Sequence, residues 1–239
     1  MDTIKIDKRQ CQMIAHRGCS GLERENTNAA FVAAGNRSYF GIETDVHVTS
    51  DGKFILFHDD TTERLTSQNL VVEQTDFETL RKLALTDVDD VTERQDIRMP
   101  SLKEYVSICK KYRRTAVLEL KNHIAEESVR EICRQIGELD YLDKMIFISF
   151  DLDNLLAVRR FYPNASIQYL TRRADGDVIK TLKENGFDLD IKYTALTREI
   201  IQKLHSEGIK VNCWTVNDKE DAERLVEWGI DFITTNILE

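Results

Sequence analysis

Residues 197–234 read TREIIQKLHSEGIKVNCWTVNDKEDAERLVEWGIDFIT, and this stretch contains the same pattern twice. Each copy has a helical segment, a glycine that suits the end of a helix, and a short apolar run. In chain order these are Thr197–Glu207, Gly208, Lys210–Thr215, Asp218–Trp228, Gly229 and Asp231–Thr234. Short apolar runs between helices predict the buried strands of a parallel sheet, which needs a crossover between neighbouring strands.

The same alternation extends over most of the chain. Six further strands are expected at Gln12–His16, Gly41–His47, Ala116–Lys121, Met145–Ser149, Ser166–Tyr169 and Leu189–Ile191. Further helices are expected at Thr27–Asn36, Ser101–Tyr112, Ala125–Glu138, Asp151–Phe161 and Asp177–Asn185. Eight strands alternating with helices predict an α/β protein with a TIM (β/α)8 barrel. An open doubly wound sheet is the alternative, and the lack of a glycine-rich loop after the first strand disfavours it.

The predicted domain organisation is one barrel domain over residues 1–239. The sequence ends at Asn236–Glu239, soon after the last strand, so the last helix is expected to be truncated or absent. Residues 59–99 are polar and interrupt the alternation after the second strand, with one apolar pair, Val71-Val72, and one helical pattern, Phe77–Leu85. A connection of this length is often functional, so we expect an insertion that acts as a lid or substrate wall.

Composition narrows the class of protein. The formal net charge of −9 argues against sequence-independent binding to nucleic acid, because phosphates would repel the chain. No run approaches the roughly 18–20 apolar residues of a transmembrane helix, and no signal peptide is recognisable. Five cysteines without a CxxC pair predict free thiols and a cytoplasmic location. Cys19, close to a cluster of polar residues, is a minor candidate for a reactive thiol.

Carboxylates fall at positions where barrel strands present side chains to the interior. Glu43 and Asp45 are two residues apart in one strand, so both point to the same side, and Glu119 and Lys121 repeat this pattern in another strand. Buried charges of one sign are costly unless a counter-ion lies among them. Glu43, Asp45 and Glu119 are therefore predicted to bind one divalent cation, Mg²⁺ or Ca²⁺, both of which prefer oxygen ligands.

Two histidines are candidates for proton transfer. His16 begins a His-Arg-Gly triplet at the end of the first strand, and His58 precedes two aspartates. A histidine titrates near neutral pH, so one can serve as base and the other as acid. Arg17 and Lys121 are candidate phosphate contacts, and Gly18 would let the backbone approach a ligand. The other histidines are expected to be structural, with His123 the best exception because it follows the third strand closely.

These residues resemble the glycerophosphodiester phosphodiesterase family. The resemblance runs through HRGCSGLERENTNAAFVAA, GIETDVHVTSDGKFILFHDDTTERLT, MPSLKEYV, LELK, FISF and NCWTVND, which cover most of the chain in order. It implies a metal-dependent barrel that cleaves glycerophosphodiesters to glycerol 3-phosphate and an alcohol. It assigns acid–base roles to His16 and His58, metal ligation to Glu43, Asp45 and Glu119, and substrate contacts to Arg17, Lys121, Glu25, Asn26 and Trp214. Arg24 replaces a proline of the family pattern just before Glu25.

The substrate expected from this resemblance is a small glycerophosphodiester. The alternatives are a lipid phosphodiesterase resembling lysophospholipase D or sphingomyelinase D, and a non-catalytic barrel that binds glycerophosphodiesters. Whether the attacking oxygen belongs to a glycerol hydroxyl or to water, which histidine is the base, which alcohol leaves and how the chain oligomerises all stay open at this point.

Overall fold

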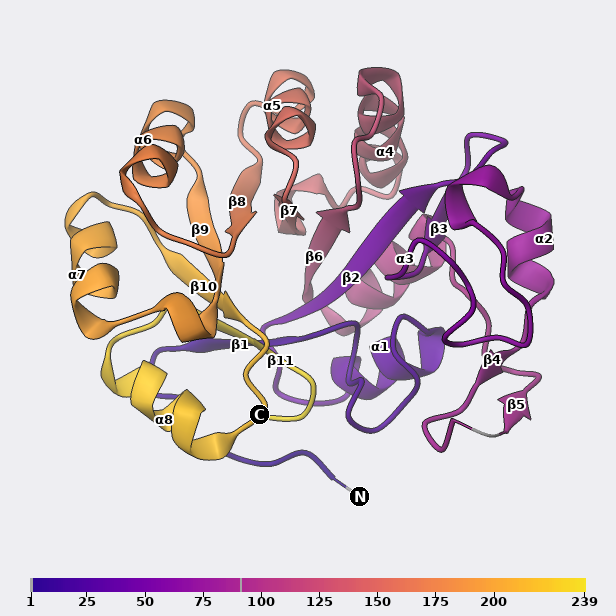
Figure 1. Ribbon diagram of the computed structural model, residues 1–239, viewed down its shortest axis with the longest axis horizontal. Helices are drawn as coiled ribbons and strands as arrows, with labels where there is room; N and C mark the ends of the chain where they lie inside the picture. Colours follow the sequence, from indigo (N-terminus) through magenta and orange to yellow (C-terminus); the bar gives the residue numbers. More distant parts are fainter. Residues whose placement is uncertain (1, 91) are drawn as a thin grey trace.

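Eight parallel strands form a closed barrel at the centre of the computed structural model, which describes residues 2–90 and 92–239 (Figure 1). The barrel strands are β1 (Gln12–Ala15), β2 (Gly41–Val48), β6 (Thr115–Leu120), β7 (Met145–Ser149), β8 (Ser166–Thr171), β9 (Asp188–Lys192), β10 (Val211–Trp214) and β11 (Phe232–Thr235). Each pairs with the next in this order, and β1 pairs with both β2 and β11. The predicted barrel is therefore confirmed, and an open sheet is excluded because the pairings of the eight strands form a closed ring.

Seven helices cover the outside of the barrel, one in each crossover. They are α1 (Asn28–Gly35), α3 (Leu102–Tyr112), α4 (Glu126–Glu138), α5 (Leu152–Phe161), α6 (Gly176–Asn185), α7 (Arg198–Ser206) and α8 (Lys219–Glu227). Ser101 and Glu104 form a capping box at the start of α3. Gly186 ends α6 with φ +62°, and Gly208 and Gly229 also have positive φ angles just after their helices.

No eighth helix follows β11 in the part of the chain that the structure describes. The residues after β11 instead run beside the N-terminal segment, where Ile4 and Leu238 form a parallel bridge. The Leu238 side chain is fully buried in the main hydrophobic core. A short tail thus follows β11 in place of a helix, and this tail contributes apolar surface to the core.

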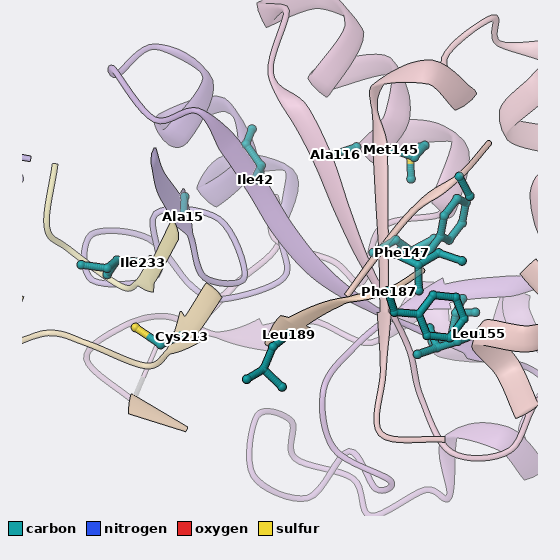
Figure 2. Close-up of a cluster of buried hydrophobic side chains, with 14 of the residues drawn as sticks. Ala15, Ile42, Ala116, Met145, Phe147, Leu155, Phe187, Leu189, Cys213 and Ile233 are labelled. Atoms are coloured by element: carbon teal, nitrogen blue, oxygen red, sulfur yellow. The ribbon is translucent and has the colours of Figure 1, made fainter. Parts of the chain in front are cut away.

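The main core lies between the barrel and its helices. Figure 2 shows strand residues of this core, among them Ile42 of β2, Phe147 of β7 and Leu189 of β9, together with Leu155 of α5. The alternate residues point into the barrel, where a smaller apolar cluster includes Ile14, Val117 and Ile148. The strands are therefore buried on both faces, which explains their nearly continuous apolar sequences.

The connection between β2 and α3 is an insertion with a small core of its own. It contains β3 (Phe54–Leu56), which pairs antiparallel with β2, then η1 (Val72–Gln74), α2 (Phe77–Lys82), β4 (Leu85–Thr86) and β5 (Glu93–Arg94). The predicted helical pattern Phe77–Leu85 is wrong at its end, because the backbone becomes extended at Leu83 and Leu85 enters β4. Figure 1 shows α2, β4 and β5 on one side of the barrel, beyond α1 and α3.

The insertion core explains the Val71-Val72 pair. The Val72 side chain is fully buried there with Leu80, Leu85 and others, while Val71 is 41% exposed. Val72 is thus a residue of the insertion core, and Val71 is its solvent-exposed neighbour.

All five cysteines are free and buried. None of the described helices is long and apolar enough to span a bilayer.

Candidate active site

A cavity of about 330 Å³ opens at the carboxyl ends of the barrel strands. Its walls combine the polar residues singled out in the sequence with apolar groups from the opposite side of the barrel. The lining residues are His16, Arg17, Glu43, His58, Glu119, Lys121, Ile148, Phe150, Leu170, Arg172, Asp190, Trp214, Thr215 and Thr234. Active sites of this fold lie at this end, so the cavity is the candidate active site.

Three carboxylates from two adjacent strands meet at one wall of this cavity. Asp45 of β2 lies directly beside Glu119 of β6 in the strand register, and Glu43 is two residues before Asp45. One carboxylate oxygen from each of the three residues lies within 4.8 Å of the other two. Glu43 and Asp45 are almost completely buried, and Glu119 is only slightly exposed. The geometry expected from the alternating pattern of the strands is therefore present.

The crowding of these carboxylates changes their ionisation. Burial and the neighbouring charges of Asp45 and Glu119 raise the pKa of Glu43 well above its usual range. Burial and Asp45 raise the pKa of Glu119 to about 7. Burial also opposes ionisation of Asp45, but the charges of Lys121 and Arg17 outweigh it and lower the pKa of Asp45. Glu43 and Glu119 thus retain their protons more strongly than isolated carboxyl groups do, and a cation bound among the three residues would take the place of those protons.

Lys121 and Arg17 are the cations beside this cluster. The Lys121 Nζ lies 3.0 Å from a carboxylate oxygen of Glu119 and 3.5 Å from one of Asp45. The Arg17 Nε lies 3.7 Å from Asp45, and the Arg17 backbone N–H donates to Glu43 at 2.7 Å. Both side chains also line the cavity, so each can reach a bound anion while it stays near a carboxylate.

Gly18 is required by packing against helix α1, and its expected role in the approach of a ligand stays a prediction. Its φ is +79°, and a Cβ atom at this position would lie 2.7 Å from the backbone carbon of Ala30. The Gly18 N–H donates to the Glu43 carbonyl, which ties the loop after β1 to β2. Gly18 therefore lets the loop that carries His16 and Arg17 sit between β2 and α1.

His16 is held by a residue that the sequence analysis missed. The His16 Nδ1 lies 2.7 Å from Oδ1 of Asn236, which comes directly after the last barrel strand. With Asn236 as acceptor, Nδ1 carries the proton and Nε2 is the unprotonated nitrogen. Burial and the nearby charge of Arg17 lower the pKa of His16 to about 4. His16 is thus a neutral imidazole at pH 7 with one nitrogen free to accept a proton.

His58 has a different environment, because its partner is a carboxylate. The His58 Nδ1 lies 2.6 Å from Oδ1 of Asp59, and Arg64 of the insertion donates to both oxygens of that carboxylate. Arg64 also makes two hydrogen bonds to Glu25, which in turn accepts from Arg17. These contacts link the segment that carries His58 to the loop after β1 through the insertion.

Glu25 and Asn26 occupy the loop before α1. Burial opposes ionisation of Glu25, but hydrogen bonds from Arg64 and the charge of Arg17 lower its pKa to about 2. Asn26 is buried with φ +51°, donates to Asp45 at 2.8 Å and accepts from Thr44 at 2.6 Å. Neither residue lines the cavity. They therefore hold the residues of the cavity wall, and direct contact with substrate, as the sequence analysis expected, has no support in this geometry.

The opposite wall is formed by Trp214, Phe150 and Asp190. Trp214 meets Phe150 edge-on with ring centroids 5.7 Å apart, and its indole N–H has no hydrogen-bond partner in the described structure. Asp190 is 2% exposed, one of its oxygens lacks a described partner, and burial raises its pKa well above 3.8. This wall is therefore largely apolar, and burial disfavours ionisation of the carboxyl at its base.

Several residues that line the cavity or contact its lining escaped the sequence analysis. Asp59 was visible in the His-Asp-Asp motif, and Phe150, Arg172 and Asn236 each stand one residue beyond the end of a barrel strand, where this fold carries its active-site groups. Arg64 gave no signal, since it lies in the insertion. His123 lies outside the cavity and forms an exposed group with Asp151 and Asp153.

Cys19 is fully buried, and burial raises the pKa of its thiol. The minor expectation of a reactive thiol is therefore wrong, because a thiolate is disfavoured there and solvent does not reach the sulfur.

A family model described as "Glycerophosphoryl diester phosphodiesterase family" matches residues 16–239. The chain belongs to this family. The glycerophosphodiester phosphodiesterase 1 of Mus musculus is 35% identical over 95% of this chain and 78% of the mouse protein. The glycerophosphodiester phosphodiesterase of Bacillus altitudinis is 28% identical over 94% of both chains.

Solved structures agree with this family membership. A phosphodiesterase of Oleispira antarctica in complex with the product sn-glycerol-3-phosphate matches with a TM-score of 0.84 and 25% identity, over 97% of this chain and 95% of that chain. A glycerophosphodiester phosphodiesterase of Parabacteroides distasonis matches with a TM-score of 0.79 and 26% identity, over 99% and 94%. The expected family and the expectation of an enzyme of this class are confirmed.

Proposed function

We propose that the chain hydrolyses glycerophosphodiesters to glycerol 3-phosphate and an alcohol, with a divalent cation bound by Glu43, Asp45 and Glu119. One observation carries the proposal: a cluster of three carboxylates, two of which line the cavity, lies beside two histidines and two basic side chains that line the same cavity. Membership of the family and the sn-glycerol-3-phosphate bound to the Oleispira antarctica relative support the choice of substrate.

The three carboxylates fit a hard cation. Their oxygens are close enough to share one ion, and the raised pKa values of Glu43 and Glu119 reflect burial and repulsion between carboxylates, both of which a bound cation would offset. Oxygen-only donors favour Mg²⁺ or Ca²⁺ over zinc. When bound, such a cation would stabilise negative charge that develops on the phosphate.

The cations of the protein would act on the remaining phosphate oxygens. Arg17 can present two N–H groups to a phosphate, and Lys121 adds a point charge. A well-placed donor of this kind typically contributes a few kcal/mol to stabilisation of the transition state.

His16 is proposed as the base and His58 as the acid. The His16 ring donates through Nδ1 to an amide oxygen, which leaves Nε2 to accept the proton of the attacking oxygen. Burial lowers the pKa of His58, while the charge of Asp45 and the hydrogen bond with Asp59 oppose this shift, so these carboxylates would stabilise the imidazolium that donates a proton to the leaving alcohol. The attacking oxygen belongs either to a glycerol hydroxyl, with a cyclic intermediate, or to water.

The experiment is to incubate the purified chain and Mg²⁺ or Ca²⁺ with glycerophosphoethanolamine or glycerophosphocholine, and to identify the products by phosphorus NMR. Appearance of glycerol 3-phosphate together with the free alcohol is expected. Release of phosphoethanolamine or phosphocholine would show cleavage of the other ester bond and contradict the proposal. A transient cyclic phosphate would identify the glycerol hydroxyl as the attacking group.

Residues 1–239 are proposed to form one domain, with 59–99 as an insertion that serves the site. Of the described residues, those in 59–99 do not line the cavity, but Asp59 and Arg64 contact His58 and Glu25. The role of a lid therefore stays a prediction. A cytoplasmic location is proposed from the five free, buried thiols. The lipid phosphodiesterase alternative gains no support from Val71-Val72, since Val72 belongs to the insertion core.

A further inference from the structure

Arg172 differs from the other cations that line the cavity. Arg17 and Lys121 each lie within 4 Å of a carboxylate. Arg172 has no carboxylate within that distance and no side-chain hydrogen bond, as far as the described residues extend. It follows the last residue of β8 and is exposed at the rim. An unpaired guanidinium there is free to bind a group of the ligand.

The position of Arg172 is set by an aromatic ring. Its guanidinium carbon lies 4.8 Å from the centroid of the Phe150 ring, within the range of a cation–π contact. Phe150 is 39% exposed and in turn contacts Trp214 edge-on. The contact with the ring therefore restricts the Arg172 side chain to a position beside the cavity mouth.

The same contact determines what Phe150 can do. An exposed aromatic ring at the rim of a cavity is the usual means of binding a quaternary ammonium group. Here one face of that ring already carries a guanidinium, and a second cation close by would be repelled. The rim is therefore unsuited to a choline group and suited to an anionic one.

The burial of the cavity residues indicates where each part of the substrate would bind. The carboxylate cluster, Asp190 and Thr234 are buried, whereas Phe150 and Arg172 are exposed. The phosphate and the glycerol belong with the buried groups, which leaves the alcohol beside the rim. This assignment rests on the proposed function.

We propose that Arg172, held against Phe150, selects glycerophosphodiesters whose alcohol carries an anionic group, and disfavours those with a quaternary ammonium. The Arg172 N–H groups would donate to a carboxylate or phosphate of the alcohol in charge-assisted hydrogen bonds. The residue that recognises the leaving alcohol thus follows β8, whereas the carboxylates lie on β2 and β6 and the two histidines follow β1 and β3.

The test uses three esters of glycerol 3-phosphate that differ in the charge of the alcohol. The alcohols are choline, its neutral isostere 3,3-dimethylbutanol, and 4-hydroxybutanoate. The kcat/KM for glycerol 3-phosphate release is measured for each ester. We expect the anionic ester to exceed the neutral one by about 10-fold, the value of one charge-assisted hydrogen bond at a partly exposed site, and the choline ester to be the poorest.

Two variants separate the role of Arg172 from general effects of charge. Arg172→Gln should bring the three kcat/KM values together. Arg173→Gln is the matched control, because Arg173 is the next residue, is exposed, pairs with Asp175 at 2.8 Å and does not line the cavity. It should leave the order of substrates unchanged. Equal thermal unfolding of both variants and the wild type would show that the fold is intact.

The outcomes distinguish this inference from the proposed function. Release of glycerol 3-phosphate without a dependence on charge overturns the inference alone. An equal loss for all three esters in Arg172→Gln would also overturn it, because Arg172 would then bind the common phosphate. If Arg173→Gln also removes the order of the three kcat/KM values, the preference for an anionic alcohol would come from the overall electrostatic potential of the protein and not from Arg172, which overturns the inference. If the wild type releases glycerol 3-phosphate from none of the esters, both proposals fail.

Discussion

His16 and His58 lie on the same cavity wall but contact different partners, an amide oxygen and a carboxylate. Each is expected to move a proton in the reaction. Replacing either by alanine should lower kcat for glycerophosphoethanolamine by roughly 10²–10⁴-fold, the range for a positioned acid or base.

His205→Ala is the control for these variants. His205 bonds to Asp231 at 2.7 Å and does not line the cavity, so this change should leave kcat close to the wild-type value. A near-normal kcat in His16→Ala or His58→Ala would remove that histidine from the mechanism.

Asn26 fixes the orientation of Asp45 by its hydrogen bond to the carboxylate. Asn26→Gly removes this bond without backbone strain, because glycine accepts the φ of +51°. Since partners of metal ligands are typically worth 10–100-fold in metal affinity, we expect the Kd for Ca²⁺ or Mg²⁺ to rise by about that factor in isothermal titration.

Arg113→Gly makes the same kind of backbone change elsewhere. Arg113 has φ +55° and ends helix α3, so this variant should bind metal with the wild-type Kd. Equal metal affinities for Asn26→Gly and Arg113→Gly would mean that Asn26 does not support a metal ligand.

Asp190 is expected to make stability depend on pH. Burial raises its pKa well above 3.8, so the folded chain keeps a proton that the unfolded chain loses above about pH 4. The folded state binds more protons in this window, and the free energy of unfolding therefore falls as pH rises, by at most about 1.4 kcal/mol per pH unit. Below about pH 4 both states are protonated and the effect vanishes.

Asp190→Asn removes this titration with little change of shape. Urea unfolding in the presence of a chelator, from about pH 4 to pH 7, should show the variant gaining stability relative to the wild type as pH rises. A difference in unfolding free energy that is constant over this range would contradict the assignment of a neutral Asp190.

At the scale of elements, the loop after β1 depends on how closely it approaches helix α1. In Gly18→Ala the new Cβ would meet the Ala30 backbone at 2.7 Å, in addition to the strain of a positive φ. Gly52→Ala is the matched control, since its φ is +73° but nothing lies within 4 Å of the new atom.

Both variants are destabilised by backbone strain at a positive φ, and only Gly18→Ala is also destabilised by a steric clash. We expect its free energy of unfolding to be lower than that of Gly52→Ala by about 1–3 kcal/mol, the usual cost of overpacking. Its kcat should also fall, because the loop carries His16 and Arg17. Equal unfolding free energies would show that α1 yields easily at this point.

The strands were the elements most accessible from sequence. The register that puts Asp45 beside Glu119 follows from the alternation of β2 and β6 and from the closed parallel order. The boundaries of α2 and the presence of β3 were not accessible, because the short insertion segments pack into a local core that no periodic pattern signals. The contact from Arg64 to Glu25 was hidden for the same reason.

At the scale of the whole molecule, closure of the barrel brings the two ends of the chain to one site. Asn236 follows β11 and His16 follows β1, and pairing of these strands sets Asn236 against the His16 ring. The sequence predicted a barrel but not this contact, since two residues more than two hundred positions apart meet only once the register of closure is known.

Metal removal tests the central claim most directly. Glycerol 3-phosphate release from glycerophosphoethanolamine is measured for the untreated chain, after exhaustive chelation, and after Mg²⁺ or Ca²⁺ is added back. Metal-ion catalysis is worth several kcal/mol, so we expect the rate to fall by at least about 100-fold on chelation and to recover with one of the two cations. An undiminished rate after chelation would contradict the assignment of Glu43, Asp45 and Glu119 as the ligands of a catalytic cation.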